Sequence, residues 1–313
     1  MDLGAVERLI EETLAGGGSL LREVGVYLLR AGGKRLRPEL VLLGARFGGE
    51  RPAARLAHLA AAVELVHMAT LLHDDVVDES AVRRGRPTAN VRWDSQTSVL
   101  VGDYLFATAF EFVSRWAAAD SWLALTGVVR TMAEGEIQEL SSRGRLDVTE
   151  QDYLDRIKKK TALFIAECPQ LGAMTADAAD GCREALGRYG YCLGMAYQIM
   201  DDVLDLTADL RTLGKPTGND LGRGVVTLPV IHGLTTSGEG RIRLQRILGR
   251  AGDGEADLKA VASILEGSGS VDYARGVAQE FAGQARQALA PLPPGPGRDR
   301  LEEIARFVLV RDR

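Results

Sequence analysis

The chain has 313 residues, of which 46% are hydrophobic and 26% charged, a composition that is ordinary for a globular protein. Its formal net charge of −5 argues against a general nucleic-acid binder, which is normally basic. Three cysteines without CxxC spacing predict neither a disulfide framework nor a zinc site and favour a reducing cytoplasm. We expect no signal peptide, because the start is acidic, and no membrane span, because no apolar run reaches about 18 residues.

Apolar residues recur at three- and four-residue steps along most of the chain, the pattern of buried helices. In chain order, the predicted helices cover residues 53–79, 99–118, 122–141, 151–167, 183–207, 256–266, 272–289 and 301–312. Segments with glycine, proline or both separate them at 31–38, 83–88, 213–220 and 291–297. Alternating strand patterns are scarce, so the chain is predicted to be all-α, with one domain over residues 1–313. A two-domain split at the glycine-rich stretch 235–254 is the alternative.

The segment LLHDDVVDES, residues 71–80, places carboxylates among apolar residues. On a helix Asp74 and Asp78 lie about 40° apart and share a face, with Asp75 beside them. Like charges on one face repel unless solvent or a cation relieves them. Taken alone, this DDxxD pattern is explained equally well by a solvated acidic helix end.

The same pattern recurs in YQIMDDVLDL with Asp201, Asp202 and Asp205, again between apolar residues. Two identical acidic patterns on separate helices fit poorly with chance surface charge. Oxygen ligands without a nearby cysteine indicate a hard cation such as Mg²⁺, whose coordination is completed by substrate phosphates. The pair of patterns therefore predicts a metal and phosphate site.

Cationic side chains that would bind phosphate accompany both acidic patterns. Arg83 and Arg84 follow the first pattern, and His67 lies two helical turns before Asp74 on the same face. The other candidates are Lys34, Arg35 and Arg37 after two glycines, Lys160 with Thr161, and Lys215 after the second pattern. This set provides for two diphosphates, one bound through metal and one bound by basic side chains directly.

These motifs resemble those of the trans-isoprenyl diphosphate synthases of the polyprenyl synthetase family. The likeness rests on GGKRLRP, ELVHMATLLHDDVVDESAVRRGRPT, VLVGDYLFA, GEIQEL, KKTALF, YQIMDDVLD, LGKPTGNDL and TLPVI, which span nearly the whole chain. The resemblance implies a single orthogonal bundle of helices around a deep central cavity, usually in a homodimer. It also implies a cytoplasmic enzyme, with peripheral membrane contact for product release as an open possibility.

The resemblance also implies a role for each site residue. Asp74, Asp78 and Asp201 would bind Mg²⁺ that bridges the allylic diphosphate, supported by Asp75, Asp202 and Asp205. The allylic diphosphate would be contacted by Arg83, Lys160, Thr161, Gln198 and Lys215. The diphosphate of isopentenyl diphosphate would be held without metal by Lys34, Arg37, His67 and Arg84.

The implied reaction is ionisation, condensation and elimination. Mg²⁺ and cationic side chains would stabilise the departing diphosphate, and isopentenyl diphosphate would attack the allylic cation and then lose a proton. Apolar helices would keep out the water that traps the cation. Released diphosphate is a plausible base for the last step.

Two positions on the helix before Asp74 bear on product length. Ala69 and Thr70 lie about one turn before Asp74, where short-chain relatives often carry bulky aromatics that close the cavity. Small residues there predict a product longer than geranylgeranyl, from heptaprenyl to nonaprenyl, although Phe106 or Met132 are alternative floors.

The chain departs from the family pattern in a few places. Val225 stands where a lysine is common, so that one phosphate-binding cation is either missing or replaced by Arg223. Asp94 stands where glycine is frequent, and Pro169 inside a predicted helix predicts a kink.

Other functions remain open at this stage. They are a geranylgeranyl diphosphate synthase, the catalytic subunit of a heteromeric prenyl synthase and, more distantly, an HD-type metal phosphohydrolase. The last gives the second DDxxD pattern no role. A regulatory subunit tends to have lost these aspartates, and this chain keeps all six.

Overall fold

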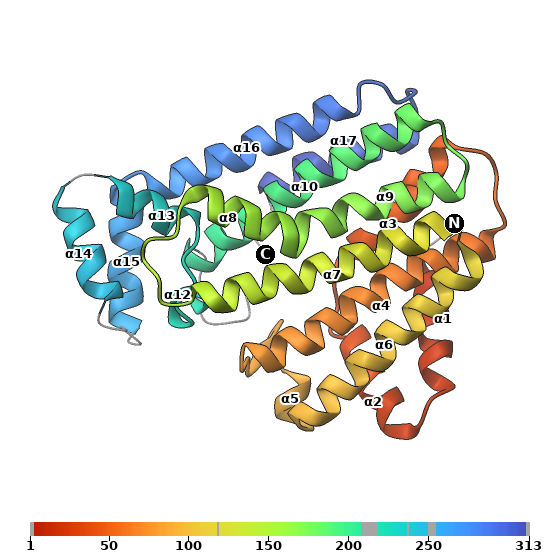
Figure 1. The fold of residues 1–313 in the computed structure, drawn as a ribbon, viewed down its shortest axis with the longest axis horizontal. Helices are drawn as coiled ribbons and strands as arrows, with labels where there is room; N and C mark the ends of the chain where they lie inside the picture. Colours follow the sequence, from red (N-terminus) through yellow and green to blue (C-terminus); the bar gives the residue numbers. More distant parts are fainter. Residues whose placement is uncertain (1–2, 118, 208–217, 237, 250–254, 311–313) are drawn as a thin grey trace. The chain divides into compact units, whose positions relative to one another are not determined.

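The computed structural model describes residues 3–117, 119–207, 218–236, 238–249 and 255–310 (Figure 1). The all-α prediction is confirmed, because the strands among these residues are only β1 (Val82–Arg83) and β2 (Arg86–Pro87). The helices of the first half are α1 (Leu3–Ala15), α2 (Ser19–Leu29), α3 (Leu36–Gly44), η1 (Ala45–Phe47), α4 (Ala53–Val77), α5 (Ala89–Arg92), α6 (Ser95–Trp116) and α7 (Ala119–Ser142). Those of the second half are α8 (Glu150–Ile157), η2 (Lys158–Ala162), α9 (Leu163–Thr175), α10 (Asp180–Thr207), α12 (Asn219–Gly222), α13 (Leu228–Thr235), α14 (Glu239–Leu248), α15 (Glu255–Gly267), α16 (Ser270–Ala288) and α17 (Pro296–Val310).

The long predicted helices are found with boundaries shifted by a few residues, except that the one predicted over 151–167 is divided into α8, η2 and α9 and continues to Thr175. The helices that sequence reasoning missed are the short ones and those at the start of the chain, because glycines interrupt their apolar pattern. Gly25 inside α2 is one example, where a Cβ would lie 2.6 Å from the side chain of Leu14. The glycine lets α2 pack closely on α1, so a residue that reads as a helix breaker serves helix packing.

The described chain divides into two compact units. Unit 1 comprises residues 1–129, 167–187 and 290–299, and unit 2 comprises residues 130–166, 188–289 and 300–313. Both sides of the glycine-rich stretch 235–254 belong to unit 2, which does not favour a split at that stretch. A single domain over the whole chain stays a prediction, as does the deep central cavity.

In unit 1, α4 is the central helix and packs against α1, α3 and α6 (Figure 1). Among the described residues it is the one helix long and apolar enough to cross a membrane, but 61% of its most apolar window is buried. Residues 59–66 are buried on all sides, and only its last turns carry a half-exposed stripe. That burial is typical of the core helix of a soluble protein, and the half-exposed stripe leads directly into the first acidic pattern.

In unit 1, α3 and the second half of α9 approach each other closely. A Cβ on Gly44 would lie 2.0 Å from the carbonyl oxygen of Pro169, and one on Gly172 would lie 1.9 Å from that of Val41. Pro169 lies inside α9, as the sequence indicates. The kink at this residue stays a prediction.

Unit 2 is built around α13, whose apolar residues pack against α8, α14, α15 and α16. Its core also contains Tyr153 of α8 and Ile199 and Val203 of α10. Between α8 and α9 the chain forms one π-helical turn, η2, at Lys158–Ala162. Such turns often occur at functional positions in helices, and this one contains Lys160 and Thr161.

Candidate active site in two acidic segments

The first acidic segment lies at the C-terminal end of α4. Asp74 is in the last turn, and Asp78 caps the helix, with its N–H donating to the Asp74 carbonyl oxygen at 2.8 Å. Both side chains are half-buried, whereas Asp75 between them is only 2% exposed. The helix therefore presents Asp74 and Asp78 on its accessible side and turns Asp75 inward.

Asp75 is held by Arg83 of the short hairpin that follows α4. Arg83 Nε donates to Asp75 Oδ1 at 2.8 Å. Burial raises the pKa of Asp75, and the charge of Arg83 opposes this shift. This contact of Nε orients the hairpin against the helix end, and the predicted role of Arg83 at a phosphate stays a prediction.

The hairpin joins β1 and β2 through Arg84 and Gly85, both with positive φ, which is the geometry of a type I′ turn. Three hydrogen bonds anchor it to the region around the end of α2. Arg84 donates to the Gly32 carbonyl oxygen, Arg86 Nη1 donates to the Arg30 carbonyl oxygen at 3.3 Å, and Tyr27 Oη donates to the Pro87 carbonyl oxygen at 2.7 Å. Arg84 is therefore placed directly over the glycine loop.

The glycine loop brings the first basic cluster beside this hairpin. A Cβ on Gly33 would lie 2.9 Å from Arg84 Nη1, so the absence of a side chain at Gly33 lets the arginine approach. Arg35, in the left-handed region, turns inward and binds Glu7 and Glu64 at 2.7 and 2.8 Å. Because Arg35 is a structural ion pair, the cations this loop presents outward are Lys34, which is exposed, and Arg37, which is half-buried.

His67 lies on the half-exposed stripe of α4, among these arginines. Burial, followed by the positive charges of Arg37, Arg84, Arg83 and Arg35, holds the pKa of His67 well below its ordinary value. The imidazole is therefore neutral at physiological pH. The predicted group of His67, Arg37 and Arg84 does come together in unit 1.

The second acidic segment lies near the C-terminal end of α10. Asp202 is 4% exposed and accepts two hydrogen bonds, from Tyr153 Oη to Oδ2 at 2.7 Å and from Gln198 Nε2 to Oδ1 at 2.8 Å. Thr161 Oγ1 donates to Gln198 Oε1 at 2.8 Å, so three predicted residues form one chain of hydrogen bonds. Tyr153 completes the chain, and sequence reasoning missed it.

The electrostatics of Asp202 differ from those of Asp75. Burial, with the nearby charge of Asp220, raises the pKa of Asp202 to about 8, against the lowering effect of its hydrogen bonds. Both of its oxygens accept hydrogen bonds, an arrangement that suits the ionised form. A divalent cation beside Asp201 would favour the same form.

Asp205 is bonded to the residues around the start of α12. Its carbonyl oxygen accepts from the Gly218 N–H at 2.7 Å, and its Oδ2 accepts from the Asp220 N–H at 3.1 Å. Asp205 is 3% exposed, whereas Asp201 is half-buried. In the second acidic segment, as in the first, the first aspartate is more accessible than the middle one.

Lys160 of the π-helical turn binds two carboxylates of α7. Its Nζ lies 2.8 Å from Glu136 Oε2 and 2.8 Å from Glu139 Oε1. Neither glutamate was predicted, although the segment GEIQEL that contains them was already notable in the sequence. The available signals were the spacing of the two glutamates, three residues or about one helical turn, and the lysine-threonine pair in KKTALF.

Glu139 also links Lys160 to two arginines. Arg156 Nε and Arg223 Nη2 each lie 3.8 Å from its oxygens, and Arg223 Nη2 lies 3.5 Å from Asp220. Burial opposes the charge of Glu139, but Lys160 and the two guanidinium groups outweigh burial and lower the pKa of this carboxyl. Arg223 therefore belongs to the cationic group that contains Lys160.

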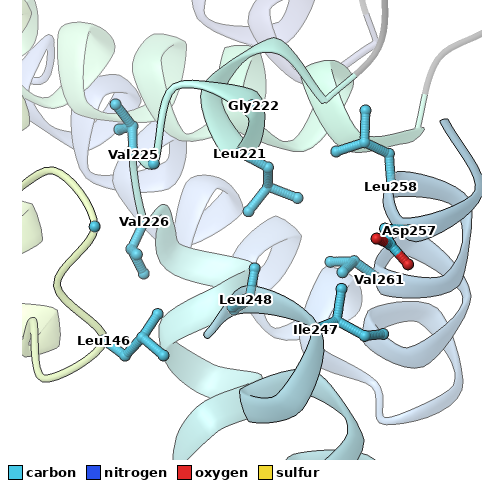
Figure 2. Close-up of a pocket in the computed structure, with 12 residues that line it drawn as sticks. Leu146, Leu221, Gly222, Val225, Val226, Ile247, Leu248, Asp257, Leu258 and Val261 are labelled. Atoms are coloured by element: carbon cyan, nitrogen blue, oxygen red, sulfur yellow. The ribbon is translucent and has the colours of Figure 1, made fainter. Parts of the chain in front are cut away.

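Val225, where a lysine is common in the family, is buried and lines an apolar pocket of unit 2. Figure 2 shows its side chain with those of Val226, Leu221 and Leu146 around a cavity of about 130 Å³. A lysine here would bring a charge to an apolar wall, which is costly unless the charge is paired. Valine in place of the family's lysine thus fits the local packing. Arg223, two residues earlier, is the nearest cation in the sequence.

The remaining predicted positions are Lys215, Ala69 and Thr70. Lys215 lies outside the described residues. Ala69 is fully buried, whereas Thr70 is half-buried on the same stripe as Asp74, with its hydroxyl donating to the His67 carbonyl oxygen at 2.8 Å. A large side chain at Ala69 would therefore need the surrounding packing to give way.

The donor set suits a hard divalent cation. Beside a buried middle aspartate that is already bonded within the protein, the first acidic segment offers half-buried Asp74 and Asp78, and the second offers half-buried Asp201. Carboxylate oxygens are the ligands that Mg²⁺ and Ca²⁺ prefer, and basic side chains in both units provide for phosphate oxygens. Taken separately, the residues of each unit thus fit a hard cation and phosphate oxygens.

The family model described as polyprenyl synthetase matches residues 18–265. The chain belongs to the polyprenyl synthetase family. It is 36% identical over 307 residues to heptaprenyl diphosphate synthase component 2 of Bacillus subtilis, covering 98% of this chain and 87% of the relative. It is 40% identical over 315 residues to the all-trans-nonaprenyl-diphosphate synthase (geranyl-diphosphate specific) of Rhodobacter capsulatus, covering 99% and 95%.

A solved structure has closely similar backbone geometry. The polyprenyl synthase of Caulobacter crescentus, crystallised with calcium and isoprenyl diphosphate, is 38% identical, with a TM-score of 0.95 over 99% of this chain and 95% of that one. The isoprenoid synthase fold implied by the motifs is thereby confirmed. The chain is a prenyltransferase, and its family uses a divalent metal ion with isopentenyl and allylic diphosphates. The resemblance to medium- and long-chain synthases is confirmed as well.

Proposed function

We propose that this polyprenyl synthetase condenses isopentenyl diphosphate head-to-tail with an allylic diphosphate and makes an all-trans product longer than geranylgeranyl diphosphate. The observation that carries the proposal is the pair of acidic segments, each joined to its own cationic group. Arg84, Arg37 and His67 gather beside the first segment, and Lys160 and Arg223 gather near the second. This division supports two diphosphate sites of different character.

The allylic diphosphate is the one whose carbon–oxygen bond must break, so its site needs the most positive charge. We assign Asp74, Asp78 and Asp201 to the metal ion, and propose that it is Mg²⁺, which takes few carboxylates plus substrate phosphates. When bound, it would neutralise charge on the departing diphosphate. Asp75, Asp202 and Asp205 would hold the segments in place, which their burial and internal hydrogen bonds support.

The side chains assigned to the allylic diphosphate are Arg83, Lys160, Thr161, Gln198 and Lys215. Thr161 and Gln198 are bonded to each other and to Asp202, so they are held in a fixed orientation. Lys160 forms ion pairs with Glu136 and Glu139. Diphosphate binding would therefore require this lysine to shift toward phosphate oxygens, while Glu139 keeps Arg156 and Arg223 as partners.

Isopentenyl diphosphate is assigned to Lys34, Arg37, His67 and Arg84. The neutral state of His67 supports this role, because an uncharged imidazole can donate one hydrogen bond to phosphate while the arginines supply the charge. The double bond of isopentenyl diphosphate would attack the allylic cation. We propose that the released diphosphate is the base that takes up the lost proton. Apolar helices would keep water from that cation.

Product length is proposed to depend on Ala69 and Thr70. The relatives of similar length that make seven- and nine-unit products support a long product. Because Ala69 is fully buried and Thr70 is half-buried, an aromatic at either position tests the space beside α4 from two sides.

A homodimer is proposed as the working assembly. Exposed apolar side chains on α6 support it, because Val99, Leu100 and Tyr104 are 37%, 67% and 37% exposed and lie within about one turn. Dependence on a second, different subunit is the alternative, since the similar Bacillus subtilis protein is named a component. We also propose a cytoplasmic location, with peripheral membrane contact when the product leaves.

Incubation with radiolabelled isopentenyl diphosphate, farnesyl diphosphate and Mg²⁺, followed by sizing of the dephosphorylated products, tests the function. The proposal expects a ladder that ends beyond geranylgeraniol. Ala69→Tyr and Thr70→Tyr should each shorten it, with Ala69→Ser as the size-matched control. A product that stops at geranylgeraniol in the wild type would contradict the long-chain assignment, and no elongation would indicate a missing partner subunit.

A further inference from the structure

Helix α14 of unit 2 carries three arginines, and they lie on either side of one exposed isoleucine. Leu244 is buried, whereas Ile242, two residues earlier and about 160° around the helix, is 57% exposed. Arg241, Arg243 and Arg246 are all exposed. Ile242 therefore points away from the protein with positive charge on both sides of it.

These arginines differ from three of the other exposed arginines of unit 2 in having no acidic partner. Arg145, Arg275 and Arg306 each form an ion pair with a carboxylate two to four residues away. Within the described part of the chain, the three guanidinium groups of α14 make no hydrogen bond or ion pair, and Glu239 in the first turn does not pair with them. The helix is thus a cationic surface on a chain whose net charge is −5.

A groove between α14 and α15 adds hydroxyl groups to this surface. Arg241 and Arg243 line it together with Thr236, Ser263 and Ser268, and its volume is about 490 Å³. The two helices contact each other directly along it, as Figure 1 indicates. Thr236 and Ser268 donate their hydroxyl protons to backbone carbonyl oxygens of Gly233 and Leu265, so the donors that face the groove are the two guanidinium groups and Ser263. Such donors suit a phosphate group, whose oxygens accept several hydrogen bonds.

We propose that α14 and this groove bind the headgroup phosphate of an anionic phospholipid, so that the enzyme docks on a membrane surface. Arg241 and Arg243 would hold the phosphate, Arg246 would add long-range attraction, and Ile242 would enter the boundary of the acyl layer. The exposed isoleucine favours a lipid surface over a free phosphate, because a soluble anion offers it no apolar contact.

The contact gives the proposed function a route for its product, and in this respect it rests on that function. A long prenyl diphosphate has an apolar tail that is poorly soluble in water, so release beside a membrane avoids exposing it. Binding of the protein to lipid is nonetheless independent of catalysis. It is measured without any substrate, so failure of one proposal is distinguishable from failure of the other.

Co-sedimentation with vesicles tests the contact. The full chain is mixed with vesicles of phosphatidylcholine alone or with half of it replaced by phosphatidylglycerol, at low and at physiological salt. We expect binding to the anionic vesicles only, weakening as salt rises. Replacing Arg241, Arg243 and Arg246 by glutamine should lower the partition coefficient about fivefold for each arginine, or roughly a hundredfold together.

Matched variants separate position from charge. Arg145→Gln, Arg275→Gln and Arg306→Gln together remove the same charge from exposed sites and should leave binding within about twofold. Ile242→Ser should weaken binding while keeping every charge. Prenyl transfer in solution should be unchanged in all of these variants, because none lies among the proposed substrate-binding residues.

Several results would overturn the proposal. They are equal binding to neutral vesicles, no binding to anionic ones, or an α14 triple variant that binds as well as the wild type. If inorganic phosphate binds in the groove and the protein binds no vesicles, the groove is a site for soluble anions instead. Vesicle binding by a wild-type chain that makes no product longer than geranylgeranyl diphosphate would count against the proposed function alone.

Discussion

Asp75 and Asp202 occupy the same position in two identical DDxxD patterns, and the structure surrounds them with different partners. Asp75 is paired with a guanidinium group, that of Arg83, whereas Asp202 accepts hydrogen bonds from the neutral donors Tyr153 and Gln198. Burial raises the pKa of both, and that of Asp202 reaches about 8. The same sequence pattern therefore gives one segment that is held by an ion pair and one that is held by hydrogen bonds from neutral donors.

The comparison also shows what the two segments share. In each one the middle aspartate is buried and bonded, while the first aspartate stays more accessible. A buried carboxylate that is already satisfied is a poor metal ligand unless it gives up its partners. We infer that the middle aspartates position the segments and that Asp74 and Asp201 bind the metal ion.

The largest expected effect follows from that division. Asp74→Asn or Asp201→Asn should lower kcat by about a hundredfold to a thousandfold, because each removes negative charge from the metal site without changing the size of the side chain. Steady-state kinetics over a range of Mg²⁺ concentrations measures this, with melting temperature as the control for folding. Equal activity in either variant would break the assignment of the metal ligands.

Glu167 is a third buried carboxylate and extends the comparison. Among the described residues, its Oε1 has neither a guanidinium partner nor a neutral hydrogen-bond donor. Burial alone raises the pKa of Glu167 to about 7. Because the folded chain favours the protonated form, this group stabilises the fold fully below its ordinary pKa, and that contribution is lost as pH rises through about 7.

The free energy of unfolding should therefore fall by about 3 kcal/mol between about pH 4 and pH 8 on account of Glu167. Glu167→Gln cannot ionise and should remove that slope, while Glu184→Gln, at an exposed position, should keep it. Denaturant unfolding across this pH range measures the difference. The same slope in wild type and Glu167→Gln would show that the group is solvated or paired in solution.

The two middle aspartates should also differ in double-mutant cycles. The coupling between Asp75→Asn and Arg83→Gln should be about 2 kcal/mol, because the hydrogen bond carries charge on both sides. That between Asp202→Asn and Tyr153→Phe should be about 1 kcal/mol, since the donor is neutral. Urea unfolding of each single and double variant gives both values, and a larger coupling at Asp202 would reverse the comparison.

The smallest expected effect concerns Arg223, which shares Glu139 with Lys160. Arg223→Ala should raise the KM for the allylic diphosphate about fivefold, the ratio that corresponds to about 1 kcal/mol. Arg275→Ala, at an exposed ion pair, is the control. An unchanged KM would mean that Arg223 is only surface charge and that nothing replaces the lysine absent at Val225.

Sequence reasoning reached the long helices and the predicted residues of each acidic segment because both rest on local patterns. The regular spacing of apolar residues around Asp74 and Asp201 can be read from the sequence alone. Tyr153, Glu136 and Glu139 were not predicted as members of the site, since their contacts join helices that are distant in sequence. The inward turn of Arg35 depends on its left-handed backbone, which no spacing rule reveals.

A crystal structure with Mg²⁺ and an unreactive allylic thiodiphosphate tests the central claim most directly. The account predicts oxygens of Asp74, Asp78 and Asp201 at about 2.1 Å from the metal ions, with Asp75 still bonded to Arg83 and Asp202 still bonded to Tyr153. An oxygen of Asp75 or Asp202 in the coordination sphere, with its present partner displaced, would contradict it.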